Sequence, residues 1–296
     1  MPTDPSRPRL SVGVVGAGRV GSVLGAALVR AGHRVVAVSA VSPASRERAA
    51  LMLPGVPVLA VPDVLAGAEL VVLAVPDDEL APLVTGLTAT SSWLPGQLVV
   101  HTSGRHGLAV MEPARAVVNP LALHPAMTFQ GTAVDLERLA GCCFAVTAAE
   151  RLRPVGEALV VEMGGEPVWV ADSDRPAYHA ALTHGANHLV TLVAQAVQVL
   201  RGAGVSAPDR VLAPLLSAAL DGALRHGDAA LTGPVSRGDA GTVAAHVREL
   251  GDETADVLPT YVALARATAV RALADGRLTP QATARVLDAL APTKEP

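Results

Sequence analysis

Short runs of apolar, largely β-branched residues alternate with helix-like stretches over the first 171 residues, and this alternation constrains the fold more than any other feature. Several runs, such as LVVLAV, are apolar at successive positions, which is typical of parallel strands buried on both faces. We therefore predict an α/β fold with a doubly wound, mostly parallel sheet. The predicted strands are Leu10–Val15, Arg34–Ser39, Glu69–Val75, Gln97–Thr102, Ala116–Asn119, Cys142–Thr147 and Pro167–Ala171.

Helix-like stretches separate these runs, and beyond Asp172 only helix-like stretches remain. Residues Arg175–Gly202 predict one long helix, because Pro176 suits a first turn and Gly202 suits a helix end. The other predicted helices are Val20–Ala31, Pro43–Leu53, Asp77–Leu87 and Ala149–Met163 before Asp172, and Pro208–His226, Gly241–Leu250, Glu253–Asp275 and Pro280–Leu290 after it.

A glycine signature, Gly16-x-Gly18-x-x-Gly21, joins the first predicted strand to the first predicted helix, and a second strand follows at Arg34. In this context the three glycines permit a tight turn, close approach of a pyrophosphate, and close packing of helix on strand. The helix N-terminus then offers N–H groups to phosphates. A turn that has lost its cofactor is the alternative. The expected nucleotide contacts are Gly16, Gly18, Arg19, Val20 and Gly21, flanked by Val75 and Pro76 of the loop Val75-Pro76-Asp77-Asp78, whose two acids also suit a helix start.

The end of the second predicted strand indicates which nucleotide binds. NAD enzymes usually place an acid there, but this chain has Ser39 and Ser42 and no acid before Glu47. Hydroxyls and the guanidinium groups of Arg46 and Arg48 suit a 2′-phosphate, so we expect NADP rather than NAD. The alternative is that the two arginines only form a solvated helix face.

These assignments divide the 296 residues into two domains, as about 150 residues per domain suggests. Residues 1–172 are expected to form an NADP-binding Rossmann domain. Residues 173–296 are expected to form an all-helical domain that contributes to substrate binding, with a cleft between the two.

The composition narrows the classes of partner. The formal net charge is −4 and only 2% of residues are aromatic, so the chain has neither the positive field nor the stacking rings of a nucleic-acid-binding protein. No window of 18 residues lacks polar side chains, and the opening MPTDPSRPRL has no apolar run. Adjacent Cys142 and Cys143 suit two free thiols in a reducing compartment. We therefore expect a cytoplasmic protein that binds neither nucleic acid nor membranes.

Lysine is almost absent. Of 23 Lys plus Arg, only Lys294 is lysine, and it lies in the tail APTKEP. Unless that tail folds back, no lysine can act as a Schiff-base amine or as a general acid. A carbonyl that accepts hydride needs a proton donor, and histidine is then the natural one near neutral pH.

Two histidine-bearing segments are expected at strand ends, where a doubly wound sheet has its ligand crevice. His101 and Ser103 belong to HTSG, and His124 belongs to LHPAMTF. Each histidine could also be a satisfied structural residue, but two such segments converging on one crevice favour a site.

The long predicted helix carries a polar stripe. At 100° per residue, His179, Thr183 and Asn187 fall within about 80° of one another, so they are expected to line the cleft. His184 and His188 lie on the adjoining face, but position 185 is glycine rather than the glutamate of the zinc protease motif. With no clear third ligand, we expect no metal.

A defined loop, LTGPVSRGD, interrupts the later helices. Its Arg237 could bind a carboxylate with Asp239 orienting it, or the two could form an ordinary surface pair. We expect His179 to donate the proton, with His124 as the other candidate, and Asn187 to position the substrate oxygen. His101, Ser103, Thr183 and Arg237 are the expected substrate contacts.

The motifs together resemble a known group of proteins. Strand–GAGRVG–helix, VLAVPDDEL, HTSG and a helical second half resemble the 6-phosphogluconate and β-hydroxyacid dehydrogenase superfamily. HTSG, LHPAMTF, YHAA…N and LTGPVSRGD resemble more closely a bacterial two-domain family, Rossmann-like and helical, of unassigned function, over nearly the whole chain. That family is similar to divergent ketopantoate reductases, and HPAM is also similar to a stretch of prephenate dehydrogenases.

The resemblance implies a small 2-oxo acid substrate and a helical domain that forms a homodimer and closes over the cofactor. It fails at one place. Superfamily enzymes often carry a Lys and an Asn one turn apart on the long helix; Asn187 matches the Asn, but Thr183 stands at the Lys position. Either His179 or His124 replaces that acid, or the chemistry is lost.

The leading expectation is thus an NADP-dependent oxidoreductase that reduces a small, ketopantoate-like 2-oxo acid. An imine or a deazaflavin is the alternative acceptor, because an iminium needs less help from an acid and this suits the missing lysine. A non-catalytic NADP-binding sensor or scaffold protein is the third possibility.

Overall fold

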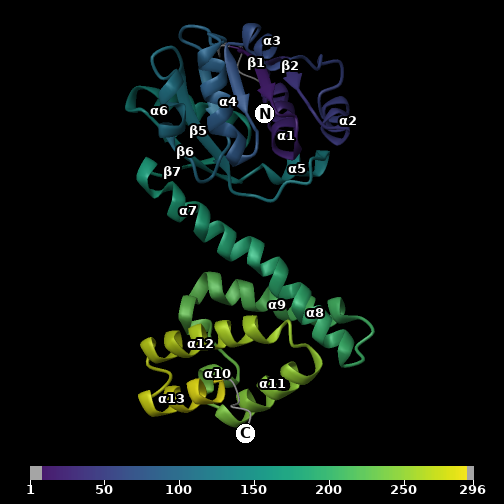
Figure 1. Cartoon of the computed structure of the whole chain (residues 1–296), viewed down its shortest axis with the longest axis vertical. Helices are drawn as coiled ribbons and strands as arrows, with labels where there is room; N and C mark the ends of the chain where they lie inside the picture. The colour runs from purple at the N-terminus through teal and green to yellow at the C-terminus, as the bar shows by residue number, and fades with distance from the viewer. Residues whose placement is uncertain (1–8, 292–296) are drawn as a thin grey trace. The chain divides into compact units, whose positions relative to one another are not determined.

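The computed structural model describes residues 9–291, which form two compact units, one ending at Gly185 and one beginning at Ala186 (Figure 1). A mostly parallel seven-stranded sheet occupies the first unit, and the second is helical throughout its described residues. The predicted fold class is therefore confirmed. Strands end at Trp169 and the long helix begins at Arg175, so the first unit includes that helix's opening turns.

The sheet has the strand order β2-β1-β3-β4-β5-β6-β7. All neighbouring strands are parallel except β5 and β6, so β6 and β7 run opposite to the other five. The carboxyl ends of β1 to β5 thus share one edge of the sheet. The strands are β1 (Ser11–Val15), β2 (Arg34–Ser39), β3 (Leu70–Leu73), β4 (Leu98–His101), β5 (Asn119–Pro125), β6 (Cys143–Ala148) and β7 (Glu166–Trp169).

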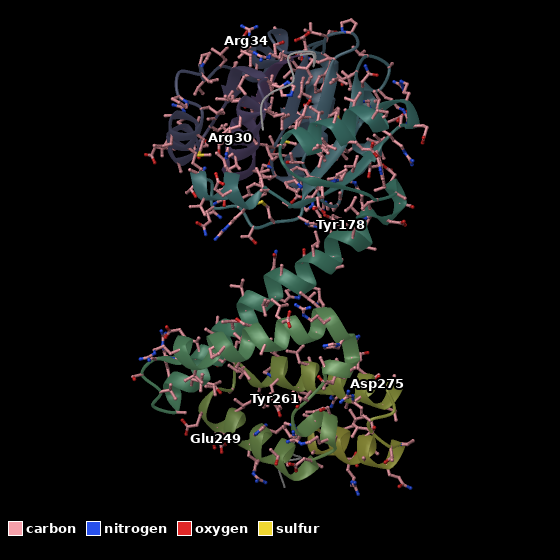
Figure 2. The ribbon with its side chains drawn as sticks, turned by 180° about the vertical axis from the view of Figure 1, so that it is seen from behind. Arg30, Arg34, Tyr178, Glu249, Tyr261 and Asp275 are labelled. Carbon is pink, nitrogen blue, oxygen red and sulfur yellow. The ribbon has the colours of Figure 1, made fainter. Side chains whose placement is uncertain are left out.

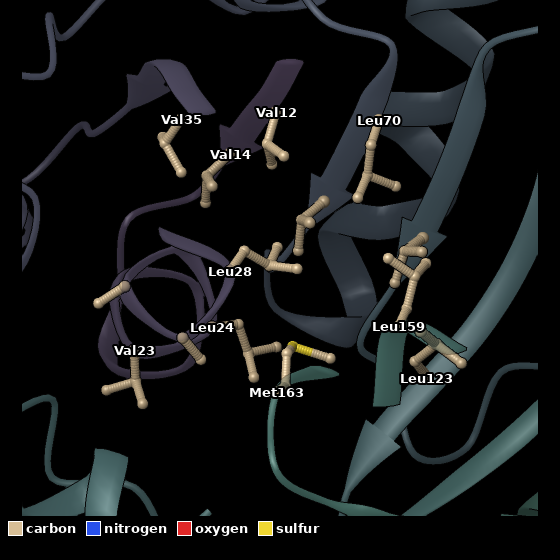
Figure 3. Close-up of a cluster of buried hydrophobic side chains, with 14 of the residues drawn as sticks. Val12, Val14, Val23, Leu24, Leu28, Val35, Leu70, Leu123, Leu159 and Met163 are labelled. Atoms are coloured by element: carbon tan, nitrogen blue, oxygen red, sulfur yellow. The ribbon is translucent and has the colours of Figure 1, made fainter. Parts of the chain in front are cut away.

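Helices cover both faces of the sheet because its central strands are apolar on both sides. Val14 of β1 packs with Leu24 and Leu28 of α1 on one face (Figure 3). Val15 packs with Leu80 on the other face. The helical elements of this unit are α1 (Arg19–Arg30), α2 (Pro43–Met52), α3 (Val61–Ala66), α4 (Asp77–Ala89), η1 (Leu108–Ala114), α5 (Ala133–Arg138), η2 (Glu150–Leu152), α6 (Arg153–Glu162), η3 (Asp172–Asp174) and α7 (Arg175–Leu182).

One predicted strand was wrong in position. The sequence favoured Ala116–Asn119, but the strand is Asn119–Pro125, so His124 lies within it rather than in a loop after it. Pro120 and Pro125 caused the error, because proline usually argues against a central strand. The short elements α3, α5 and η1 were not predicted, since six or seven residues carry little helical periodicity.

The predicted long helix is interrupted. A π-helical segment, η4 (Thr183–Asn187), separates α7 from α8 (His188–Gly202). A π turn holds more residues than an α turn, so the angle expected between His179 and Asn187 does not hold. The remaining helices are α9 (Pro208–His226), η5 (Gly227–Ala230), α10 (Pro234–Arg237), α11 (Ala240–Glu253), α12 (Leu258–Ala274) and α13 (Pro280–Ala289).

A small apolar cluster holds the later helices together, with Val243, Ala269 and Val286 fully buried. No helix within residues 9–291 is long and apolar enough to cross a bilayer. The cytoplasmic location stays a prediction, and Lys294 lies outside the described residues.

Candidate active site

The glycine turn between β1 and α1 has the geometry that the sequence implied. Gly16 has φ +91°, and a Cβ there would lie 2.7 Å from the carbonyl oxygen of Ala74. A Cβ on Gly21 would overlap the carbonyl oxygen of Gly16, whereas one on Gly18 would have no described atom within 4 Å. The turn is thus tightly packed at Gly16 and Gly21, whereas the space next to Gly18 is open.

The start of α1 adds the electrostatics of an anion site. Gly18 is its N-cap, no side chain caps it, and its first turn, which begins with Arg19 and Val20, holds no acidic residue. The N–H groups of a helix N-terminus attract phosphate. These residues therefore fit the pyrophosphate of a dinucleotide.

Ser39 has a structural role that the sequence did not suggest. Its hydroxyl accepts a hydrogen bond from the N–H of Gly16 at 3.0 Å, and its carbonyl accepts one from Ala17 at 2.8 Å. Ser39 therefore ties the glycine turn to the end of β2. Val75 lies beside Gly16, and Pro76 is the N-cap of α4.

The candidate residues for a 2′-phosphate come from the start of α1 and from the segment after β2. Ser42 caps α2 by accepting a hydrogen bond from the N–H of Ser45 at 3.1 Å, and exposed Arg46 donates from Nε to the carbonyl of Ala40 at 3.3 Å. Arg19 and Arg48 both lie against Gly131, since a Cβ there would be 3.2 Å from the Cα of Arg19 and 2.6 Å from the Cδ of Arg48.

The sequence did not point to the loop that carries Gly131. Buried Asp135 holds it, because one carboxylate oxygen accepts hydrogen bonds from the N–H groups of Gln130, Gly131 and Thr132 at 2.8, 2.7 and 3.2 Å. Thr132 followed by Asp135 is a capping pattern, and this was the available signal.

His101 is fully buried at the end of β4. Its Nε2 is 3.1 Å from the carbonyl oxygen of Gly107, and its Nδ1 has no hydrogen-bond partner within the described residues. Burial, with the charge of Arg175 and partly offset by the bond to Gly107, lowers the pKa of His101 to about 3. His101 is therefore neutral at pH 7 and is part of the buried interior at the end of β4.

Ser103 shapes the turn that follows. Its hydroxyl accepts a hydrogen bond from the N–H of His106 at 3.0 Å, and the side chain is buried. Next to it, a Cβ on Gly104 would lie 2.5 Å from Cδ2 of His179 and 2.9 Å from Nε2 of His124. Only glycine at 104 lets both rings approach the turn.

A cluster of three rings is the centre of the candidate site. Nδ1 of His124 lies 2.9 Å from the hydroxyl of Tyr178, which Figure 2 labels on α7. The ring of His179 meets that of His124 edge to face, with centroids 6.0 Å apart. His124 comes from β5 and the other two rings from α7, and all three are half-buried. The sequence singled out both histidines as candidates and gave Tyr178 no role.

The environment keeps His124 and Tyr178 of this cluster uncharged near pH 7. Burial, helped by Arg175 and His179, lowers the pKa of His124 to about 4. Burial also raises the pKa of Tyr178, although the charge of Arg175 acts in the opposite direction. A neutral imidazole beside a protonated phenol can exchange one hydrogen bond in either direction, depending on the tautomer.

Arg175, which the sequence did not single out, lies next to this cluster and is 0% exposed. Its guanidinium donates to the hydroxyl of Thr147 at 2.8 Å and to the carbonyls of Ser103, Ala122 and Ala145 at 2.7, 2.9 and 2.9 Å. All four acceptors are neutral. Burial lowers the pKa of Arg175 to about 10, so the guanidinium stays charged at pH 7.

The remaining predicted residues lie further along the chain. Thr183 is half-buried at the start of the π segment, in the first unit, and exposed Asn187 ends that segment in the second. Arg237 is exposed on α10, and Asp239 caps α11 by accepting a hydrogen bond from the N–H of Thr242 at 3.2 Å. His101, Ser103, His124 and His179 thus belong to one unit, while a role for Asn187 and Arg237 stays a prediction.

A cavity of about 710 Å³ lies elsewhere, beside the ends of β6 and β7. Arg115 and Arg153 line it, but each is paired with an exposed glutamate, Glu112 and Glu150. We place the candidate site at the glycine turn and the ring cluster instead, because both arginines that line this cavity are already paired with carboxylates.

Two family models match the chain. Residues 2–125 match a Rossmann-like domain, and residues 142–268 match a domain of unknown function (DUF2520). No curated protein matches.

Solved structures share the fold at low sequence identity. A candidate NADP oxidoreductase from Bacteroides fragilis aligns with a TM-score of 0.75 and 23% identity over 88% of this chain and 98% of its own. A protein from Thermotoga maritima aligns with a TM-score of 0.65 and 20% identity over 90% and 99%. A reductive aminase from Aspergillus terreus, in complex with NADPH and ethyl levulinate, aligns with a TM-score of 0.64 and 16% identity over 94% and 99%.

Proposed function

We propose that this protein is an NADP-dependent oxidoreductase that reduces a small 2-oxo acid to the hydroxy acid. The observation that carries the proposal is the presence, in one compact unit, of an open glycine turn at a helix N-terminus and a ring cluster on the same sheet edge. The solved structures with this fold include proteins whose descriptions name NADP or NADPH, which supports the cofactor.

The nucleotide would lie on the turn from Gly16 to Gly21, with its pyrophosphate at the start of α1. Ser42, Arg46 and Arg48 would bind the 2′-phosphate, and this is why we propose NADP rather than NAD. Ser39 would act by holding the turn rather than by touching the ribose, because its hydroxyl already binds Gly16.

Tyr178 is our proposed proton donor, in place of His179, which the sequence favoured, and of His124, the other candidate. With a pKa of about 4, His124 carries no additional proton at pH 7, whereas Tyr178 keeps its own. In the tautomer with hydrogen on Nδ1, His124 donates to the phenol oxygen and leaves the phenol O–H directed to substrate. His179 closes the other side of His124.

When bound, NADPH supplies the hydride that converts the carbonyl carbon to C–H. The substrate oxygen then takes the proton of Tyr178, which regains one from solvent. Asn187, expected from the sequence to position that oxygen, and Arg237, expected to bind a carboxylate, belong to the second unit, and their roles stay predictions. A substrate contact for Thr183 likewise stays a prediction.

Reduction of an imine is the second candidate. Its support is the fold shared with the reductive aminase over 94% of this chain, together with the single lysine of the sequence. A protonated imine would be disfavoured by the buried charge of Arg175, whereas a developing alkoxide would be stabilised by it. We therefore place the 2-oxo acid first.

We also propose that the protein is a homodimer through its helical unit. No residue of α8 is buried, and α9 buries only Pro208 and Leu212. Yet apolar side chains on both helices are exposed, Val190 to 70% and Leu224 to 80%. A second copy would cover this surface.

Oxidation of NADPH by a panel of 2-oxo acids, cyclic imines and deazaflavins tests the proposal. We expect turnover with a 2-oxo acid, slower turnover with NADH, and at least a tenfold preference over the imines. A preference for imines would support the second candidate. Tight NADPH binding without turnover of any acceptor would favour a sensor or scaffold and overturn the enzyme.

A further inference from the structure

The structure assigns a role to Arg175, as a positioning residue that fixes the His124–Tyr178 pair and supplies the permanent positive charge that selects an anionic substrate. This inference rests on the proposed function for its substrate, but not for its geometry. Nothing in the sequence distinguished Arg175 from an ordinary first-turn residue of the helix.

Arg175 connects four parts of the first unit at one point. Its acceptors belong to the turn after β4, to β5 and to β6, and the arginine itself begins α7. His124 follows Ala122 by two residues on β5, and Tyr178 follows Arg175 by three residues on α7. One guanidinium therefore holds both backbones that carry the pair.

Holding these backbone segments in place does not by itself require a charged side chain. Burying a guanidinium without a hydrogen-bonded carboxylate is unfavourable, and a neutral amide could donate to part of the same acceptors. The acceptors of Arg175 are three carbonyls and one hydroxyl, so no hydrogen bond neutralises its positive charge, and Asp172 is the carboxylate that favours this charge from a distance. The positive electrostatic potential of Arg175 therefore remains available to attract a bound anion.

The groups around His124 show how this field acts. Asp77 of α4, which favours the protonated ring, contributes least. Arg175 and His179 of α7 both disfavour protonation, and Tyr178 contributes a hydrogen bond. With the ring of His124 kept neutral, a carboxylate or a developing alkoxide beside it interacts with the charge of Arg175, and His124 adds no charge of its own.

Two substitutions separate charge from geometry. Arg175→Gln removes the charge and keeps two donors, and Arg175→Lys keeps the charge with fewer donors in a different geometry. The matched control is Arg225→Ala, which removes an exposed arginine that is paired with Asp221 on α9.

The first readout needs no turnover, so it distinguishes failure of this inference from failure of the proposed function. Nuclear magnetic resonance of the imidazole follows the titration of His124 in each full-length variant. We expect its pKa to rise by about half a unit or more in Arg175→Gln and to change little in Arg175→Lys and Arg225→Ala. An unchanged titration in Arg175→Gln would overturn the electrostatic role.

The second readout compares 2-oxobutanoate with its uncharged methyl ester. We expect the wild-type protein and Arg175→Lys to prefer the acid, and Arg175→Gln to lose at least tenfold of that preference in kcat/KM. Should Arg175→Gln fail to fold, the ratio in the wild-type protein and Arg237→Ala decides. Equal rates with acid and ester, or a preference that vanishes entirely in Arg237→Ala, would contradict a selective role for Arg175.

Discussion

Each unit of this protein contains a histidine hydrogen-bonded to a tyrosine, and the two pairs have nearly the same geometry. Nδ1 and the phenol oxygen are 2.9 Å apart both in His124–Tyr178 and in His246–Tyr261, and the rings meet edge to face with centroids 5.6 and 5.9 Å apart. Burial raises the pKa of both phenols.

Their surroundings differ. The first pair is half-buried at the edge of a sheet, with His179 against its imidazole and the charge of Arg175 beside it. The second pair joins α11 to α12 at an exposed position. A hydrogen-bonded histidine and tyrosine therefore do not make a site; the glycine turn, the third ring and the buried charge distinguish the first pair from the second.

The largest difference between the pairs should appear in turnover. We expect Tyr178→Phe to lower kcat about 100-fold or more, because a positioned acid contributes on that scale. Tyr261→Phe, which removes the same hydroxyl from the other pair, should change kcat less than twofold by the same absorbance assay. Equal effects of the two substitutions would show that the pairs are both structural.

Nucleotide binding should depend on the first unit alone. In Gly21→Ala the new Cβ overlaps the carbonyl oxygen of Gly16, so we expect NADPH affinity to fall about 100-fold. Gly86→Ala on α4 is the control, since a Cβ there meets no described atom within 4 Å. Calorimetric titration measures both. Unchanged affinity in Gly21→Ala, with the fold intact by circular dichroism, would place the nucleotide elsewhere.

Charge placed on the helical unit should break the proposed dimer. We expect Val190→Glu combined with Leu224→Glu to weaken dimerisation roughly 30-fold, because two buried carboxylates would lose hydration. Val41→Glu in the first unit, where the native side chain is 91% exposed, should leave the dimer intact. Analytical ultracentrifugation measures the oligomeric state of each variant, and a monomeric wild-type protein would contradict the dimer.

Acid should destabilise the protein through the first pair. The pKa of His124 in the fold is about 4, below the ordinary 6.5, so the unfolded chain takes up its proton first. The contribution of His124 to stability is complete above pH 6.5 and declines as the pH falls towards 4, by up to about 1.4 kcal/mol per pH unit, and His101, with a pKa of about 3, adds a similar decline. In thermal unfolding, the stability of His124→Gln should decline less steeply with falling pH than that of the wild-type protein. A decline in His124→Gln as steep as in the wild-type protein would contradict the assignment.

Local sequence patterns predicted the parts that depend on neighbours along the chain. The tight turn at Gly16 and Gly21 was predictable because a turn between strand and helix leaves room for no side chain at those positions, whereas their contact with a nucleotide stays a prediction. The helix Pro208–His226 was predicted to its exact bounds, since proline and histidine mark its ends.

Contacts between distant segments were not predictable in the same way. Tyr178 and His124 are 54 residues apart, and whether they meet depends on where α7 lies on the sheet. Arg175 was missed because arginine is rarely buried, and only the tertiary fold shows four acceptors around it. The sequence suggested a phosphate contact for Ser39 because it does not show the bond from Gly16, which joins the turn after β1 to the end of β2.

Imidazole resonances of the two pairs during addition of NADPH test most directly whether the nucleotide binds against His124 and Tyr178. We expect the resonances of His124 to shift with a saturating dependence on NADPH, while those of His246 stay in place. Saturable binding of NADPH that leaves His124 unmoved, or that moves both histidines equally, would contradict the assignment of the first pair as the site.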